Sequence, residues 1–518
     1  MKKMLYPIGE QDFRSLREGG YVYVDKTMFI QKLVDSGTKY CFLARPRRFG
    51  KSLFLSTLKY FFEGQRELFK GLYIDTVNHD WESRPVLYLD LNSDRYAEPG
   101  KLDGVLDRLL REWEEKYAVE VKDSDFAQRF ATVIARAHEM TGRQVVILVD
   151  EYDKPLVGNL NKDRNFEHYR SRLASLYSNF KSGADHIRLV FLTGVSRFSK
   201  LSVFSDLNNL EDITFLDAYS DICGITEREL TDNFHHGIRA FADANGLNDE
   251  EAVATLKDNY DGYRFAWRGS DIYNPWSVLN CLKQSVVAYY WNETGLPTII
   301  AESLKRVNAD LEKTLDTFCS DKDLKGFDLL NPNPAALLYQ TGYLTIKQYI
   351  PRLKRYRLGI PNKEVRAGLL DTLLPYYVKT GRTTPNQVVS DIAMYFMSGE
   401  PDMAMQEVQT YFAGIPYDLK MDNENNFHNA FYILLDLIGL EAKAEAHTSD
   451  GRIDLLIETE DFIYIIELKY DRSAEEALRQ IEEKHYDLKF RTDGRRIFRI
   501  GVRFSSTTRR IEDWLIKR

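Results

Sequence analysis

The stretch YCFLARPRRFGKSLFLSTLKYFF, residues 40–62, decides the fold of the first part of this chain. Residues 40–43 are apolar and predict a buried strand, a tight turn follows that contains Gly50-Lys51-Ser52, and an amphipathic helix begins there. A strand, a loop and a helix in this order direct backbone N–H groups and the positive end of the helix at a phosphate group. We therefore expect a nucleotide site at this turn.

The residues of the turn have defined chemical tasks. Lys51 can reach the β and γ phosphates, and Ser52 can ligate Mg²⁺. The usual loop pattern GxxxxGK[ST] has a glycine where this chain has Arg45. A GKS tripeptide also occurs by chance, so a second element is needed. We expect a bound nucleotide to lie against the whole loop, which consists of Arg45, Pro46, Arg47, Arg48, Phe49, Gly50, Lys51, Ser52 and Leu53.

That second element is the apolar run 145–149, which ends in Asp150 and Glu151. At a nucleotide site, the aspartate holds the water shell of the metal and the glutamate polarises the attacking water. A third strand ends at Thr193, which could sense the γ-phosphate, and Arg197 beyond it could neutralise transition-state charge. An ordinary strand end with a surface arginine explains this third strand equally well.

Length and composition limit the class of protein. With 518 residues, the chain should hold about three domains, since domains average roughly 150 residues. Its 44% hydrophobic and 29% charged residues exclude a disordered chain. No apolar run approaches the ~20 residues of a membrane-spanning helix, and the N-terminus lacks the apolar core of a signal peptide. We therefore expect a cytoplasmic protein without a membrane partner.

The pattern of apolar residues divides the chain into three parts. Residues 1–290 alternate short strand-like runs with helical stretches, which predicts a parallel sheet with helices on both faces. Residues 291–415 are mostly helical, and strand-like runs around Gly342 are typical of a winged-helix-like lobe. Residues 416–518 read as a helix, three strands, a helix and a strand. The predicted fold class is α/β, with a helical middle region.

Charge restricts where a nucleic acid could bind. The net charge of -8 means that the molecule as a whole repels polyphosphate, so any such site must be a local patch. From Lys484 to the end, eleven Lys and Arg residues stand against four Asp and Glu residues. We expect this basic tail to contact phosphates in a salt-sensitive and mostly sequence-independent way.

The last part of the chain also holds a pattern of acids and a lysine. Because side chains alternate along a strand, Glu467 and Lys469 project to one face, and Asp454 joins them if its strand pairs with theirs as a hairpin. Two carboxylates gathered in this way can bind one or two Mg²⁺ ions, and the lysine can orient a water. The spacing alone is more often a solvated ion pair. The strongly apolar strands around it favour a functional site, since charges there are costly to bury.

Six segments together resemble the bacterial AAA-ATPase-like family of P-loop NTPases, over about residues 4–290. These segments are RPRRFGKSLFLSTLKYFF, VVILVDEYDKPL, FLTGVSRFSKLSVFSDLNNL, ICGITEREL, YDGYRF and IYNPWSVL. In that family an arginine-rich loop is typical, so Arg45 fits the pattern. The resemblance implies that Lys51 and Ser52 bind phosphate and Mg²⁺, and that Asp150 and Glu151 form the Walker B pair.

Residues from about 420 to 505 are similar to a PD-(D/E)xK nuclease domain, of the kind often found behind this ATPase-like module. The matching segments, in order, are ENNFHNAFYILL, AEAHTSDGRIDLLIE, IYIIELKY, EEALRQIEEKHY and IGVRF. The resemblance implies a catalytic core of Asp454, Glu467 and Lys469, with Asp454 and Glu467 as ligands of Mg²⁺ or Mn²⁺. It also suggests Glu424 as a helix-borne acid and Gln480 as an auxiliary residue.

The leading hypothesis is an ATP-hydrolysing protein fused to a metal-dependent nuclease, in which ATP turnover controls access to a nucleic acid, with DNA the first expectation. Two alternatives stay open. The protein could be an ATP-operated switch whose last domain binds protein or nucleic acid without cleavage, or a DNA-binding regulator. The acidic net charge and the lack of an obvious basic recognition helix near residues 335–360 count against the regulator. A homo-oligomer that shares an arginine between ATP sites is also left open.

Overall fold

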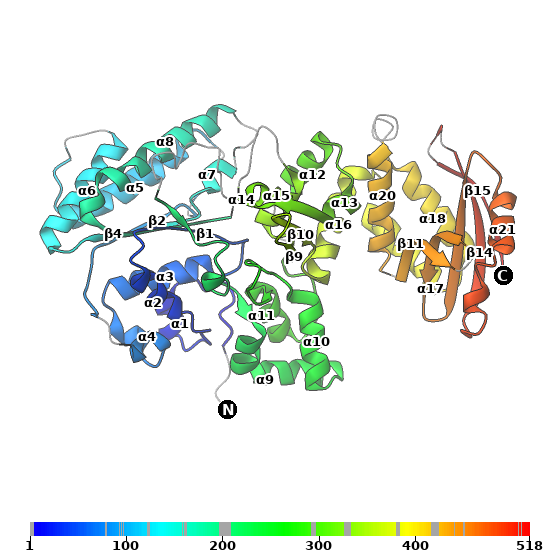
Figure 1. Cartoon of the computed structure of the whole chain (residues 1–518), viewed down its shortest axis with the longest axis horizontal. Coiled ribbons are helices and arrows are strands. Elements are labelled where there is room, and N and C mark those ends of the chain that lie inside the picture. Colours follow the sequence, from blue (N-terminus) through cyan, green and yellow to red (C-terminus); the bar gives the residue numbers. More distant parts are fainter. Residues whose placement is uncertain are drawn as a thin grey trace. The chain divides into compact units, whose positions relative to one another are not determined.

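A computed structural model of the chain describes residues 5–77, 80–92, 94, 96, 98–121, 125–157, 159, 163–195, 209–291, 297–325, 333–379, 384–415, 424–439, 441–448, 451–505, 507–508 and 510–518 (Figure 1). The chain divides into two compact units. The N-terminal unit comprises Met1–Thr294 and Leu315–Val365, and the C-terminal unit comprises Gly295–Thr314 and Arg366–Arg518. The middle region is thus divided between the units, and the boundaries at residues 290 and 415 stay a prediction.

A five-stranded sheet in the order β2-β3-β4-β1-β5 forms the centre of the N-terminal unit, and all neighbouring strands are parallel. The strands are β1 Tyr40–Ala44, β2 Val86–Asp90, β3 Val145–Asp150, β4 Ile187–Gly194 and β5 Glu211–Asp212. Every residue of β1 and β3 is buried, because helices cover both faces of a parallel sheet. The expected parallel sheet of an α/β fold is confirmed.

Helices α5, α6 and α8 lie on one side of this sheet, and α1 to α4 lie on the other (Figure 1). Their bounds are α1 Phe13–Glu18, α2 Met28–Ser36, α3 Lys51–Phe62, α4 Tyr73–Thr76, α5 Lys101–Lys116, α6 Phe126–Thr141, α7 Lys154–Val157 and α8 Asp163–Ser182. Strand β4 lies between β1 and β3, with Gly194 beside Ala44 and Leu192 beside Val149. The loops that follow these three central strands therefore meet at one edge of the sheet.

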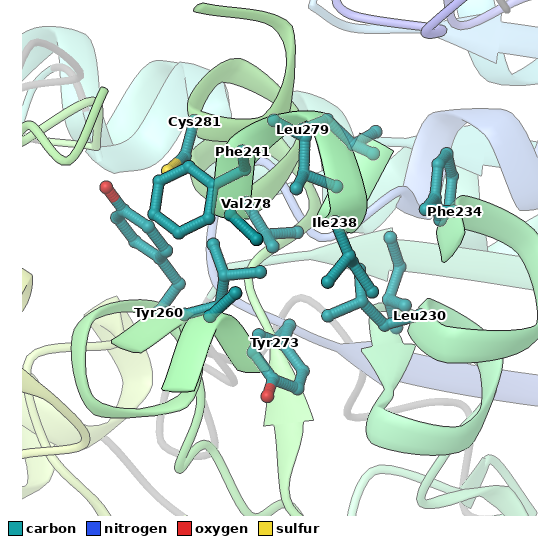
Figure 2. Close-up of a cluster of buried hydrophobic side chains, with 14 residues drawn as sticks. Leu230, Phe234, Ile238, Phe241, Tyr260, Tyr273, Val278, Leu279 and Cys281 are labelled. Atoms are coloured by element: carbon teal, nitrogen blue, oxygen red, sulfur yellow. The ribbon is translucent and has the colours of Figure 1, made fainter. Parts of the chain in front are cut away.

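A helical part of the N-terminal unit has its own apolar core (Figure 2). It consists of β6 Ile225–Thr226, α9 Glu227–Asn245, α10 Asp249–Tyr260, β7 Ile272–Tyr273 and α11 Pro275–Gln284. Capping boxes at Thr226 and Asn248 fix the starts of α9 and α10. Asn274 caps α11, and Pro275 is its first residue. The segment Asn274-Pro275-Trp276 therefore has a clear structural role.

A small antiparallel sheet in the order β8-β10-β9 completes the N-terminal unit. Its elements are β8 Asp316–Ser320, α14 Asp321–Lys325, α15 Pro334–Thr341, β9 Thr345–Ile350 and β10 Arg355–Gly359. Residues 335–341 of α15 are all buried. Gly342 ends α15 with a φ of +90°, and a Cβ there would lie 2.7 Å from the Cβ of Pro46. A glycine thus allows this region to touch the loop after β1.

The C-terminal unit contains a second five-stranded sheet, in the order β11-β12-β13-β14-β15. Only β13 and β14 are parallel neighbours. The strands are β11 Glu441–Thr448, β12 Gly451–Glu458, β13 Phe462–Tyr470, β14 Arg496–Ser505 and β15 Arg510–Lys517. The sequence pattern does not predict β15, which lies within the basic tail. Its apolar residues pair with β14 although charged residues separate them.

Helices accompany this second sheet. Helix α21 Ala474–Glu483 packs on β13 and β14, and the Tyr464 hydroxyl of β13 donates to the carbonyl of Phe396 at 2.6 Å. The other elements of this part of the chain are α12 Pro297–Arg306, α13 Leu311–Leu315, α16 Lys363–Tyr377, α17 Pro385–Met397, α18 Pro401–Ala413 and α20 Glu424–Leu437. Within the ranges described above, no helix combines the length and apolar character that crossing a membrane requires.

Candidate functional site

The first candidate site forms where the loop after β1 meets α3. Lys51 is the first residue of α3 and is only 4% exposed. Its ammonium group donates to the carbonyl oxygens of Arg45 at 3.0 Å and Pro46 at 3.2 Å, and lies 3.1 Å from Oε1 of Glu151. The lysine is therefore held at the start of the helix by groups that a phosphate could replace.

Asp150 ends β3 beside this lysine and is 2% exposed. The Thr193 hydroxyl donates to its Oδ1 at 2.7 Å, and the Ser52 side chain also bonds to the carboxylate. Burial raises the pKa of Asp150, and the charge of Glu151 raises it further. The hydroxyls of Ser52 and Thr193 oppose that rise. A serine hydroxyl beside a carboxylate is a donor set that fits Mg²⁺.

Glu151 follows in an unusual backbone conformation. Its φ is +52°, a region that residues other than glycine rarely adopt. Such a conformation costs about 1–3 kcal/mol and persists where the surroundings impose it. The next amide, of Tyr152, donates to the carbonyl of Thr193 at 2.9 Å and so ties this turn to β4. The carboxylate of Glu151 is thereby directed to Lys51.

Arg45 points into the protein rather than across the loop surface. Its guanidinium donates to the carbonyl oxygens of Ala44, Thr214 and Tyr219 at 2.9–3.0 Å. It also lies 4.3 Å above the ring of Phe265, and its burial lowers its pKa. Arg45 thus connects the loop to residues 214–219, and its role as a nucleotide ligand stays a prediction.

The remaining loop residues contact later parts of the chain. Pro46 lies against Gly342, and the carbonyl of Arg47 accepts a hydrogen bond from the indole of Trp291 at 3.4 Å. The guanidinium of Arg48 lies 4.2 Å from the centre of the Trp276 ring. The ring of Phe49 contacts Tyr263 and Phe265. Leu53 is half-buried on α3. Arg197 lies outside the described residues. The sequence reading missed these partners, since no local pattern links residues so far apart.

The second candidate site lies on β12 and β13, which pair as the predicted hairpin. The register places Leu455 beside Ile466, so that Asp454 and Glu467 are neighbours across the two strands. Oδ2 of Asp454 accepts from the amide of Leu468 at 2.8 Å. The ammonium of Lys469 lies 3.2 Å from Oε1 of Glu467, on the same face of the strand. The structure therefore brings the three predicted core residues together.

Gln480 of α21 bridges the acid and the lysine of this site. Its amide nitrogen donates to Oε1 of Glu467, and its amide oxygen accepts from Lys469. The hydroxyl of Tyr486 lies 3.4 Å from the same amide nitrogen. Gln480 therefore lies at the second candidate site, and its auxiliary role stays a prediction. Glu424 begins α20, and its side chain lies outside the described part of the chain.

Glu467 carries an unsatisfied acceptor. The residue is 1% exposed, and among the described residues its Oε2 has no hydrogen-bond partner. Burial raises the pKa of Glu467, the charge of Asp454 raises it further, and Lys469 opposes the rise. A buried acceptor without a partner is unfavourable by about 1–3 kcal/mol. Two neighbouring carboxylates, one of them with an oxygen that has no partner in the described structure, are a donor set that fits Mg²⁺ or Mn²⁺.

Sequence reasoning also missed Gly501. This residue lies beside Glu467 in the parallel pair of β13 and β14. A Cβ at Gly501 would lie 2.2 Å from the carbonyl oxygen of Ala474 and 2.7 Å from the amide nitrogen of Leu478. Only a glycine there allows the backbone of α21 to approach the sheet closely enough for Gln480 to reach Glu467.

Carboxylates oppose much of the charge of the basic tail. Five of its basic residues lie within 4 Å of an acid: Arg491 and Arg499 with Asp487, Arg495 with Glu458 and Asp493, Arg503 with Glu512, and Lys517 with Glu482. Three of the five acids that form these pairs, Asp487, Asp493 and Glu512, lie inside the tail. The other partners, Glu458 and Glu482, come from outside it.

Comparisons with known proteins match the two regions of the chain that contain these candidate sites. Residues 7–204 match the family model described as a predicted AAA-ATPase, and residues 422–514 match that of the PD-(D/E)XK nuclease superfamily. A protein of Azotobacter chroococcum mcd 1, described as an uncharacterized protein in the vnfD 5' region, is 36% identical over 529 residues. That alignment covers 100% of this chain and 99% of the relative. The chain therefore belongs to the AAA-ATPase-like family and carries a C-terminal domain of the PD-(D/E)XK nuclease superfamily.

Proposed function

We propose that this protein binds and hydrolyses ATP at the loop after β1 and cleaves nucleic-acid phosphodiesters at the site on β12 and β13. ATP turnover controls access of the nucleic acid to the second site. The observation that carries the nuclease assignment is the buried Oε2 of Glu467, which has no hydrogen-bond partner among the described residues and belongs to a side chain beside Asp454 and Lys469. A domain that only binds its partner would gain nothing from an acceptor held without a donor.

At the ATP site, the residues present suggest a sequence of contacts. The phosphates bind the ammonium of Lys51, and the ion pair between Lys51 and Glu151 breaks. Glu151 becomes free to polarise the attacking water. Ser52 and Asp150 would hold Mg²⁺, and Thr193 keeps the Asp150 carboxylate in place through its hydroxyl. The Lys51–Glu151 pair therefore keeps the site inactive until a nucleotide arrives.

At the nuclease site, Asp454 and Glu467 would hold Mg²⁺ or Mn²⁺. When bound, such an ion polarises the phosphodiester and lowers the pKa of a water. Lys469 orients that water, and Gln480 restricts the ammonium to one position by accepting a hydrogen bond from it. The leaving oxygen departs on the opposite side of the phosphorus atom, as in-line displacement requires.

The test is cleavage of circular single-stranded and supercoiled double-stranded DNA with Mg²⁺ or Mn²⁺, with and without ATP. We expect the wild-type protein to cut and Glu467→Ala to lose at least about 100-fold in rate, since it removes a metal ligand. Glu460→Ala is the matched control, because Glu460 is an exposed acid in the turn between the same two strands. It should cut as the wild type does.

Absence of cleavage by the wild-type protein, on DNA and on RNA, with ATP hydrolysis intact, would contradict the nuclease. That result would favour an ATP-operated switch. Equal cleavage with and without ATP would leave the nuclease in place and contradict the control by ATP turnover.

A further inference from the structure

The hairpin of β9 and β10 carries a concentration of positive charge that neither site uses. Residues 347–357, KQYIPRLKRYR, contain five basic residues and no acidic one, in a chain whose net charge is -8. The hairpin lies outside the residues matched by both family models. A local basic segment in an acidic protein is the kind of patch through which a polyphosphate can bind.

Most of this charge is accessible. Arg352 and Lys354 occupy the turn, Arg355 begins β10, and all three side chains are exposed. Among the residues that the structure describes, none of the three forms an ion pair. Arg357 differs, because Asp316 binds it through two hydrogen bonds of 2.6–2.7 Å. Lys347 also differs, because its ammonium donates to the carbonyl of Pro361.

Aromatic and apolar groups accompany the charges. Phe318 of β8 is 47% exposed and lies beside Arg357 in the register of the sheet. Leu353 at the tip of the turn is 64% exposed. Exposed rings beside basic side chains are typical of surfaces that bind nucleic acid, because bases can stack on the rings while phosphates contact the cations.

The opposite face of the hairpin is anchored. Ile346 of β9, Leu358 of β10 and Cys319 of β8 are all at most 3% exposed, and α14 and α15 contact this sheet. The hairpin is therefore a fixed part of the N-terminal unit. Since residues 335–341 of α15 are buried, this helix cannot enter a groove of DNA. Contacts to the backbone and to unpaired bases are the ones this surface can make.

We propose that the β9–β10 hairpin binds nucleic acid through its phosphodiester backbone, with Arg352, Lys354 and Arg355 as the phosphate contacts. The inference rests on the proposed function for the presence of nucleic acid, but it concerns a different surface. The main electrostatic contact with nucleic acid is then made by the hairpin and not by the basic tail. Five basic residues of the tail already have carboxylate partners, whereas the three hairpin cations have no ion-pair partner in the described structure.

The test is a binding measurement in which no cleavage can occur. Fluorescein-labelled single-stranded and duplex DNA are titrated, in EDTA, with Glu467→Ala and with the same protein carrying Arg352→Ser, Lys354→Ser and Arg355→Ser. We expect the triple substitution to weaken binding by at least about tenfold at low salt. It should reduce the slope of log affinity against log salt by roughly 2–3, because each phosphate contact contributes nearly one to that slope.

The matched control removes the same charge from exposed helical positions of the N-terminal unit, through Lys101→Ser, Lys116→Ser and Lys181→Ser. It should change affinity by less than about twofold. Circular dichroism and ATP hydrolysis verify that all variants are folded. Equal losses in the control and the hairpin variant would overturn the proposal, because they would mean that only net charge matters.

Two further outcomes separate this inference from the proposed function. Unchanged DNA binding in the hairpin variant, while the wild-type protein cuts DNA, overturns the inference and leaves the nuclease standing. Binding through the hairpin without any cleavage by the wild-type protein supports the inference and contradicts the nuclease. Loss of binding to phosphatidylserine vesicles, with DNA binding unchanged, would assign the hairpin to a lipid surface and overturn the proposal.

Discussion

The two candidate sites are built from the same kinds of residue but differ in how their acids are satisfied. Each has a buried carboxylate whose pKa is raised by burial and by a second acid, and each has a lysine nearby. At the first site, hydroxyl groups already bond to Asp150. At the second, Glu467 keeps one oxygen without a partner in the described structure.

Under the proposed function, this difference corresponds to the route by which each site would obtain its metal. A Mg²⁺ ion reaches an ATP site together with the phosphates, so the protein groups can satisfy one another until then. A nuclease site must bind its metal through protein ligands, and an unpaired oxygen is ready for that purpose. The energetic penalty of the unpaired oxygen is then removed by the ligand rather than by the fold.

The largest expected effects come from removing the lysine of one site or of the other. Lys51→Ala should abolish ATP hydrolysis, because Lys51 is the residue that we expect to reach the β and γ phosphates. Lys469→Ala should reduce cleavage by at least about 100-fold and leave ATP hydrolysis largely intact. Both activities are measured on both variants, by phosphate release and by DNA cleavage.

Lys154→Ala provides a control for the first site, since Lys154 begins α7 after β3, the strand that ends in Asp150, and its ammonium donates to Asn92. It should hydrolyse ATP at a rate close to that of the wild type. If Lys469→Ala lost both activities, the two sites would not be separable, and the comparison between them would fail.

A smaller effect is expected from Gly501→Ala, which changes the second site without touching its polar groups. The new methyl group collides with the backbone of α21, so the helix must move and Gln480 with it. Cleavage should fall by about tenfold, with ATP hydrolysis unchanged. Gly104→Ala is the control substitution, because a Cβ there meets no atom within 4 Å.

A double-mutant cycle shows whether Gly501 acts through Gln480. If it does, Gly501→Ala combined with Gln480→Ala should cleave no more slowly than Gln480→Ala alone, because the bridge is lost in either case. Additive losses would mean that Gly501 supports the fold in general and does not position Gln480.

Much of the fold and of both sites could be predicted from the sequence, for a physical reason. Asp150 and Asp454 lie on apolar strands. The alternation of side chains along a strand, or the position of a residue at its end, determines the direction in which each side chain projects. What could not be predicted depends on distant segments. Arg45 is held by carbonyl groups about 170 residues later, and Gly501 matters only because α21 packs on its strand.

Strand β15 could not be predicted from the sequence for another reason. Its charged residues are exposed, and its pairing with β14 cannot be recognised from the sequence alone. The segment therefore resembles an unstructured basic tail in the sequence. The same pairing explains why the charge count of the tail was misleading. Ion pairs such as Arg503 with Glu512 and Lys517 with Glu482 form only after β15 and α21 are in place.

The smallest expected effect tests the unpaired oxygen directly, through stability. Because the folded state raises the pKa of Glu467, ionisation of this carboxyl opposes folding above the raised pKa, and this penalty disappears as the pH falls below the ordinary value of about 4.3. Glu467→Gln removes the charge. Without metal, we expect it to raise the melting temperature of the C-terminal unit at pH 8 by about 2–4 °C, as a change of about 1 kcal/mol would.

The gain should shrink as the pH approaches 4, where wild-type Glu467 is protonated, and Mn²⁺ at pH 8 should stabilise the wild-type protein but not Glu467→Gln. Asp150→Asn should gain less, because Ser52 and Thr193 already donate to that carboxylate. Calorimetry in EDTA and in Mn²⁺ measures all three proteins. An equal gain for both substitutions would mean that burial alone sets the penalty, since the unpaired oxygen is the feature that Glu467 has and Asp150 lacks.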